Sequence, residues 1–263
     1  MKRYLKIYWL FFASSWQLFL SHRFDFFMGV VANILWTLSQ LVALQFLFVK
    51  VKSFGDWSMG DLVLLLGMGQ VYVYTSWLLF EHNFSALFNK INSGAFDRML
   101  TKPVNIKFMA TMERVTVSQL LPMMTTVVPL IVYGLSMRQE LHLVDFGLAM
   151  VVCFLGIVAM YLLGLTLSGL IFFFEDIQSV RDLLTMQITE LSRVPLSVFP
   201  KLLQQILTFV IPLAFIAYYP VMIIRNQASF ISVFVIEIMI VLVLYFLSKI
   251  TWKEGLKHYS GVG

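Results

Sequence analysis

The side chains that could bind a metal or act as nucleophiles are few, and they lie far apart in the sequence. The histidines fall in separate segments without H-E-x-x-H or related ligand spacing, at His22, His82, His142 and His258. Cys153 is the one cysteine and lies within an apolar run, so it can form neither an internal disulfide nor a thiolate metal site. We therefore expect no metal site, no bound cofactor and no catalytic site.

Polar side chains within apolar stretches are more informative. Glu237 is the only formally charged residue inside an otherwise apolar span, where a carboxylate is costly. It is either a structural carboxyl that faces the helix bundle or a participant in substrate passage. Glu190 and Arg193 are three residues apart and can pair on a helix. Asn33 and Gln40 share a helix face, where such amides more often join helices than bind a cargo.

The composition places these residues in a lipid bilayer. Hydrophobic residues make up 60% of the 263 residues and charged residues only 13%, whereas soluble domains carry roughly 25% charge. The mean hydropathy of +0.85 agrees. The net charge of +5 does not indicate nucleic-acid binding, because Lys and Arg that flank membrane spans orient the chain and meet anionic lipid headgroups.

The charged residues divide the chain into apolar segments long enough to cross a membrane, which takes about 20 residues. The clear spans are predicted at 26–49, 62–80, 115–137, 146–174 and 230–248. The stretch between them is ambiguous, because prolines follow each other at Pro195, Pro200, Pro212 and Pro220. Either 183–199 is a cytoplasmic amphipathic helix and 202–224 a span, or 183–199 is a polar-faced span and 201–224 a broken re-entrant segment.

The start of the chain and the basic residues set the orientation. Residues 1–23 resemble a signal peptide, but aromatic residues at helical spacing opposite a serine-containing face favour a helix in the membrane interface. With a cytoplasmic amino terminus, 15 of the 19 Lys and Arg residues lie inside, or 13 if 183–199 is a span. Either count predicts that both termini are cytoplasmic. The outer loops are short, so we expect no extracellular ligand-binding domain.

The cytoplasmic connection between the second and third spans has a helical pattern. Phe84, Leu87, Phe88 and Ile91 fall at helical spacing, with Lys90 and other polar residues opposite. One interpretation is an interfacial helix with solvated charges. The other is a docking element for a cytoplasmic protein, since a small apolar stripe beside mixed charges fits a groove.

The connection ends in a distinctive turn. Gly94 is placed to end the helix as a C-cap glycine. Pro103 blocks helix continuation, and Asn105 can cap the helix that follows.

Three runs of sequence resemble ABC-2 type transporter permeases. The run 91–103, INSGAFDRMLTKP, is similar to the family segment in which a glycine is followed by an acidic residue, a leucine and a Lys-Pro pair. The runs 193–200, RVPLSVFP, and 209–220, FVIPLAFIAYYP, are similar to the late region of one bacterial subfamily. The resemblance extends from the amino-terminal helix to the last span.

The resemblance implies an all-α integral membrane protein that forms a single transmembrane domain over residues 1–263. Its parts are six spans, an amino-terminal interfacial helix, a cytoplasmic coupling region at 84–103, and re-entrant helices between spans five and six. It favours the second interpretation of the ambiguous stretch, with span five at 183–199 and the re-entrant segment at 201–224.

The resemblance also implies partners. No G-x-x-x-x-G-K-[ST] motif occurs in the chain, so ATP is expected to be bound by separate ABC ATPase subunits. A second permease subunit, identical or related, is expected to complete a translocation path in a bacterial inner membrane, for export of an amphipathic or hydrophobic small molecule, lipid or peptide. The residues expected to couple to the ATPase are Phe84, Leu87, Phe88, Lys90, Ile91, Gly94, Asp97, Arg98, Lys102 and Pro103. Those expected near the path are Asn33, Gln40, Glu190, Arg193 and Glu237.

Two other classes compete with this interpretation. An ion-coupled secondary transporter often has inverted repeats and several ionisable residues at mid-membrane, whereas here only Glu237 clearly lies mid-span. An integral-membrane enzyme would need clustered polar residues at one interface, which the sequence lacks.

Overall fold

The protein is an all-helical membrane protein. The computed structural model describes residues 2–21, 23–50, 55–138, 142–174 and 177–259, and these contain no strand. Five described segments are long and apolar enough to cross a membrane: Phe26–Val49, Met59–Leu79, Val117–Ser136, Leu143–Leu170 and Phe230–His258. They overlap the five clear spans predicted from the sequence.

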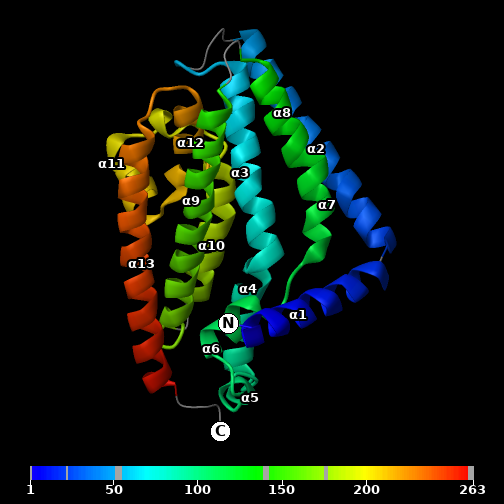
Figure 1. Cartoon of the computed structure of the whole chain (residues 1–263), viewed down its shortest axis with the longest axis vertical. Helices are drawn as coiled ribbons and strands as arrows, with labels where there is room; N and C mark the ends of the chain where they lie inside the picture. Colours follow the sequence, from blue (N-terminus) through cyan, green and yellow to red (C-terminus); the bar gives the residue numbers. More distant parts are fainter. Residues whose placement is uncertain (1, 22, 51–54, 139–141, 175–176, 260–263) are drawn as a thin grey trace.

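The first two helices lie at one edge of the molecule. Helix α1 (Lys2–Ser21) meets α2 (Arg23–Lys50) at a corner that lies away from the bundle (Figure 1). Trp9, Phe12 and Trp16 stack along α1, and both tryptophans are exposed, as the membrane-interface interpretation requires. Of the residues in the most apolar 18-residue stretch of α2, only 11% are buried. The corresponding share for α3 (Met59–Leu79) is 72%.

Helix α3 lies at the centre of the bundle, and its start is tied to two other segments. Ser58 and Asp61 form a capping box there. The Asp61 carboxylate also pairs with Arg138 at 2.7 Å and with Arg225 at 3.4 Å. One acidic side chain therefore joins the start of α3, the end of the third span and the end of α12 (Tyr218–Ile224).

The third span is irregular because it contains two prolines. Pro129 has no amide hydrogen to donate to the carbonyl one turn earlier, and a π-turn forms just before it. The Thr125 and Thr126 hydroxyls bond to carbonyls of the preceding turn. In chain order the span consists of a 3-10 turn (Val117–Gln119), α7 (Leu120–Pro122), the π-turn (Met123–Val127) and α8 (Val128–Ser136).

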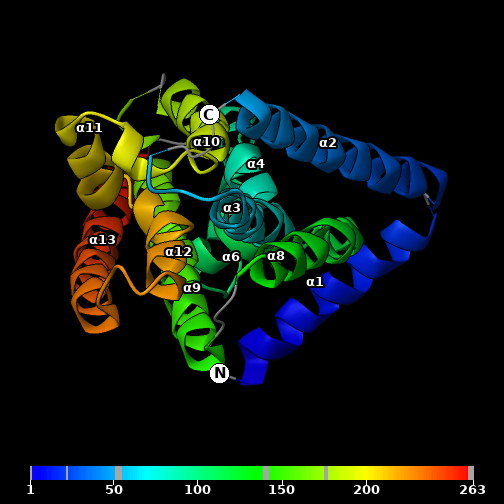
Figure 2. The same ribbon diagram turned by 90° about the horizontal axis from the view of Figure 1, so that it is seen from above.

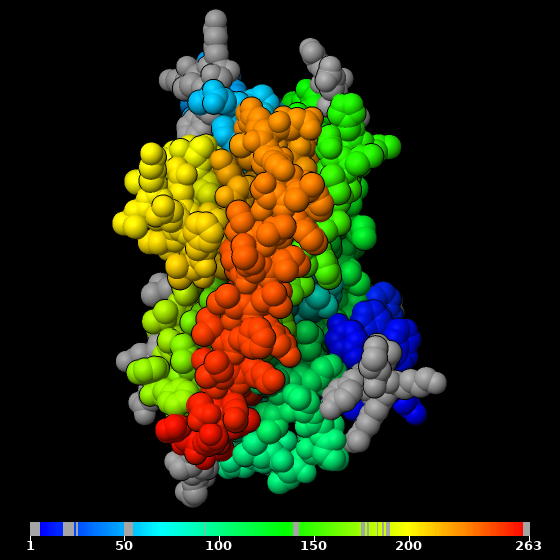
Figure 3. Space-filling view, turned by 60° about the vertical axis from the view of Figure 1, so that its left-hand side comes forward, coloured from blue at the N-terminus to red at the C-terminus, as the bar shows by residue number. Residues whose placement is uncertain are grey.

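Helices α9 (Leu143–Leu170) and α13 (Phe230–His258) pack along each other on the side away from α2 (Figures 1 and 2). The Trp252 indole donates to the Leu165 carbonyl at 2.7 Å. Outward-facing residues of α13 are large and apolar, among them Ile231, Met239 and Phe246. Figure 3 shows α13 running along this face of the molecule, where lipid would contact it.

The stretch between α9 and α13 differs from the prediction. The helix expected over 183–199 lies at Ile177–Leu191 instead, as α10. It ends before Pro195 because a proline disfavours helical backbone in the residue before it. At 15 residues, α10 is shorter than the five apolar segments.

A bent helical pair follows α10. A 3-10 turn (Leu196–Val198) leads to α11 (Lys201–Gln205), a π-turn (Ile206–Val210), a 3-10 turn (Leu213–Phe215) and α12. The halves Lys201–Val210 and Leu213–Ile224 are bent by 80°, and both lie at the same end of the bundle (Figure 1). Gly156 of α9 admits the close approach of this pair, because a Cβ there would lie 2.9 Å from the Phe215 backbone.

Candidate functional site

The connection between the second and third spans lies at the opposite end of the bundle from the bent pair, beside the start of α10 and the end of α13 (Figure 1). It contains α4 (Glu81–Asn92), α5 (Asp97–Leu100) and α6 (Ile106–Met112). Gly94 has a φ of +68°, the left-handed conformation expected of a C-cap glycine. The Asn105 side chain accepts from the Phe108 amide at 3.3 Å and caps α6, as its position predicted.

The apolar stripe of α4 faces the protein's own core. Phe84 and Leu87 are 2% and 0% exposed, and Ile91 is 9% exposed. The Phe84 ring packs against Phe80 and Tyr161. A partner therefore cannot contact these three predicted coupling residues in this structure. They attach α4 to the bundle, and Phe88 is only half-buried.

The accessible part of the connection is α5 and the turn after it. Arg98, Lys102 and Pro103 are exposed, and Leu100 is 40% exposed. Lys90 is bound within the chain, in an ion pair with Glu113. We call Arg98, Leu100, Lys102 and Pro103 the exposed turn.

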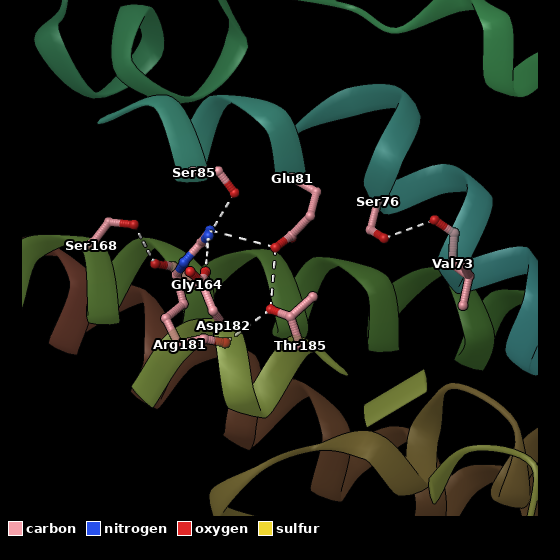
Figure 4. A network of polar contacts seen from close by, with 9 residues as sticks. All are labelled: Val73, Ser76, Glu81, Ser85, Gly164, Ser168, Arg181, Asp182 and Thr185. Atoms are coloured by element: carbon pink, nitrogen blue, oxygen red, sulfur yellow. Dashed lines mark hydrogen bonds and ion pairs between the residues drawn. The ribbon is translucent and has the colours of Figure 1, made fainter. Parts of the chain in front are cut away.

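A buried ion network joins α4 to α10 (Figure 4). The Arg181 guanidinium lies 3.5 Å from Glu81, and both side chains are less than a tenth exposed. Arg181 also donates to Ser85 at 2.8 Å and to Asp182 at 2.6 Å. Thr185 donates to the Glu81 carboxylate at 3.2 Å. The start of the coupling helix is thereby fixed to the start of α10.

Burial governs the ionisation of Glu81. Loss of water raises the pKa of the Glu81 carboxyl above its ordinary value, and the charge of Arg181 and the hydrogen bond from Thr185 oppose this only in part. A cavity of about 30 Å³ lies beside the pair. The contact is thus a buried ion pair, in which removal of one side chain leaves the charge of the other without a counter-charge.

An aromatic cluster fixes the turn that precedes α5. Phe96 is fully buried, and its ring lies 5.5 Å from Phe172 and 5.1 Å from Tyr259. Phe172 in turn packs edge-on against Trp252. These contacts connect the coupling region to the ends of both α9 and α13.

The polar residues predicted within the membrane divide into two groups. On the α2 side, Tyr74 donates to the Asn33 amide oxygen at 3.0 Å. Arg193 pairs with Glu190 at 2.9 Å, as its spacing predicted, and its guanidinium lies 5.8 Å from the centre of the Trp36 ring.

Two of these polar residues lack partners among the described residues. The amide atoms of Gln40 on α2 are buried without one. Glu237 is fully buried on α13, and neither of its carboxylate oxygens has a partner. Because α13 and α2 lie at opposite sides of the bundle (Figure 2), the structure does not bring Glu237 together with Asn33, Gln40, Glu190 and Arg193.

The sequence did not reveal the residues that hold the coupling region in place. Arg181 lies 100 residues from Glu81, and Tyr259 lies far from Phe96. A run of aromatic residues at 172–174 and a lone arginine in an amphipathic helix indicate nothing by themselves, since their meaning depends on the segments they meet.

Comparison with protein families matches most of the chain to one of them. The family model described as "ABC-2 family transporter protein" matches residues 34–263. No curated protein and no solved structure matches the chain. The match includes the coupling connection, the bent pair, four of the five described spans and the first span from residue 34 onward, but not α1.

Proposed function

The chain belongs to the ABC-2 transporter family, and we propose that it is the permease subunit of an ATP-binding cassette exporter. It works as a dimer with an identical or related permease and is driven by separate ATPase subunits. One observation carries the proposal: the coupling connection presents an exposed turn while its other face is bound into the bundle through Phe84, Phe96 and Glu81.

The contacts of this connection support a route for force. Closure of two ATPase subunits on ATP pushes on the exposed turn. Phe96 passes the movement to α9 and α13 through Phe172 and Tyr259. The Glu81–Arg181 pair passes it to α10. Rigid elements that shift together can convert nucleotide binding into opening of a path.

The path itself is proposed to run along the α2 side. Asn33, Gln40, Glu190 and Arg193 supply polar groups there at membrane depth, and a second subunit would enclose them. In this proposal α10 is the fifth span and 201–224 is the re-entrant segment on the outer side. Both chain ends, which lie outside the described residues, are cytoplasmic in a bacterial inner membrane, in keeping with the distribution of Lys and Arg.

The cargo class follows from what the chain offers. Most of its surface at membrane depth is apolar, and in this proposal the longest outer connection contains the re-entrant segment 201–224. An amphipathic or hydrophobic small molecule, lipid or peptide suits a path that is reached from the bilayer. Membrane lipids are therefore the third class of partner, beside the ATPase and the second permease.

The test uses charge reversal on the exposed turn. We expect the double variant Arg98→Glu and Lys102→Glu to lose co-purifying ATPase while it still inserts in the membrane. The control is Lys201→Glu, an exposed lysine at the opposite end of the bundle, which should retain the ATPase. Retention of the ATPase by the double variant would contradict docking at this turn.

A further inference from the structure

A cavity of about 430 Å³ lies between α2 and the third span. Thr37, Leu38 and Gln45 line it from α2, and Thr125, Pro129 and Tyr133 line it from the facing span. Figure 2 shows α2 and α8 on the same side of α3. We call this cavity the α2 groove; its volume is in the range of small-molecule sites.

The groove follows from the local sequence. Helix α2 packs against α7 and the π-turn of the third span, and the groove opens where the span continues past Pro129 into α8. On another of its faces, α2 is attached to α3 by the hydrogen bond that Tyr74 donates to Asn33. The seam between α2 and α8 stays open.

The dimensions and chemistry of the groove point to its occupant. From Ile34 to Gln45 the helix rises about 16 Å, close to half of the roughly 30 Å hydrocarbon core. The groove thus extends from near the middle of α2 toward the end away from α4–α6 (Figure 1). Its walls are mainly apolar, whereas Gln45 and Tyr133 are exposed polar residues in the part nearer that end.

We propose that the α2 groove binds one acyl chain of a membrane phospholipid from the outer leaflet. The choice of leaflet rests on the proposed function, which places α4–α6 in the cytoplasm. The chain fills the seam between α2 and the third span, and the polar headgroup lies near Gln45 and Tyr133. A bound chain would hold α2 at a fixed distance from α8, on the side where the path is proposed.

The experiment uses the full chain in vesicles of phosphatidylethanolamine and phosphatidylglycerol, with a small fraction of phosphatidylethanolamine that carries a photoreactive diazirine on one acyl chain. After illumination, labelled peptides are identified by mass spectrometry. We expect labelling of 34–45 and 125–133 in excess of the lipid-facing residues of α13, and reduction of this excess by unlabelled phospholipid.

Two variants fill the groove from opposite walls, Leu38→Trp and Thr125→Phe. Each should lose the excess labelling, while Leu35→Trp should keep it, because Leu35 is exposed on the same helix but does not line the groove. Thermal unfolding in detergent checks that each variant is folded, and the second wall keeps the test valid if one is not.

Three results would overturn the proposal: labelling of the groove no stronger than that of α13, labelling that neither filled variant reduces, or cross-links that join the groove to a second copy of the chain instead of lipid. Excess labelling at the other end of α2 would contradict the outer-leaflet assignment. Labelling does not require the ATPase, so its outcome is separate from the test of the exporter.

Discussion

Arg181 and Glu81 meet at the end of the bundle that contains α4–α6, 3.5 Å apart and 100 residues apart in sequence, with both side chains buried. The pair joins the first residue of the coupling helix to the first turns of α10. In a buried pair of this kind each charge compensates the other, and either charge alone would destabilise the folded protein at the same place.

Removal of one member of this pair should therefore cost more than removal of both. We expect Arg181→Met to destabilise the protein by roughly 3–5 kcal/mol, because the Glu81 carboxylate loses its counter-charge. The double variant Glu81→Met and Arg181→Met should recover much of this loss, measured by unfolding in detergent. The exposed Glu254–Lys257 pair is the control, and its removal should have little effect. A double variant with the summed loss of both single variants would contradict the account.

The same pair predicts a pH dependence. Burial raises the pKa of Glu81, so the folded protein binds a proton more readily than the unfolded chain does. Ionised Glu81 therefore lowers the stability of the folded protein at a pH above its folded-state pKa. This cost disappears as the pH falls toward the ordinary pKa of a Glu side chain. The melting temperature of the wild type should therefore improve relative to Glu81→Gln as pH is lowered through this window. An unchanged difference across that pH range would argue against the raised pKa.

Substitution of Phe96 in the aromatic cluster should reduce both the stability of the protein and its coupling to the ATPase. Phe96→Ala removes a fully buried ring and should cost about 3–5 kcal/mol, while Phe96→Leu should cost less. In the complex with its ATPase, the alanine variant should hydrolyse ATP with reduced export, because the exposed turn is detached from α9 and α13. Leu100→Ala, at a residue 40% exposed, is the control for stability. Full export by Phe96→Ala would show that force takes another route.

Glu237 predicts a contrast between two substitutions. Glu237→Gln keeps the shape of a fully buried side chain that has no partner among the described residues, so its stability should be close to that of the wild type. Glu237→Lys places a longer, charged group at the same site and should lower the yield of folded protein strongly. Export by Glu237→Gln is the decisive measurement for function: normal rates fit a structural role, and abolished export would place Glu237 in the path.

The sequence predicted much of the fold because length and hydropathy alone define membrane spans. The apolar stripe of α4, the Gly94 C-cap and the Asn105 cap were all visible as local patterns. The predicted helix over 183–199 was wrong because it ran through Pro195, whereas α10 begins at Ile177 and ends at Leu191, before this proline.

The candidate site could be predicted only in part. The spacing of Phe84, Leu87 and Ile91 shows that one face is apolar but not which surface covers it, and that surface is the protein's own core. The partners of Glu81 and Phe96 come from α10, α9 and the end of the chain, so they depend on the assembled bundle. No local pattern contains that information.

The most direct measurement is recovery of the tagged chain from its native membrane in mild detergent, with its stoichiometric partners identified by mass spectrometry. We predict an ATPase with a Walker motif in an amount equal to the permease chains, together with a second copy or a related permease. Reproducible recovery of the chain alone, with transport driven by an ion gradient in vesicles that lack ATP, would contradict the account and identify a secondary transporter.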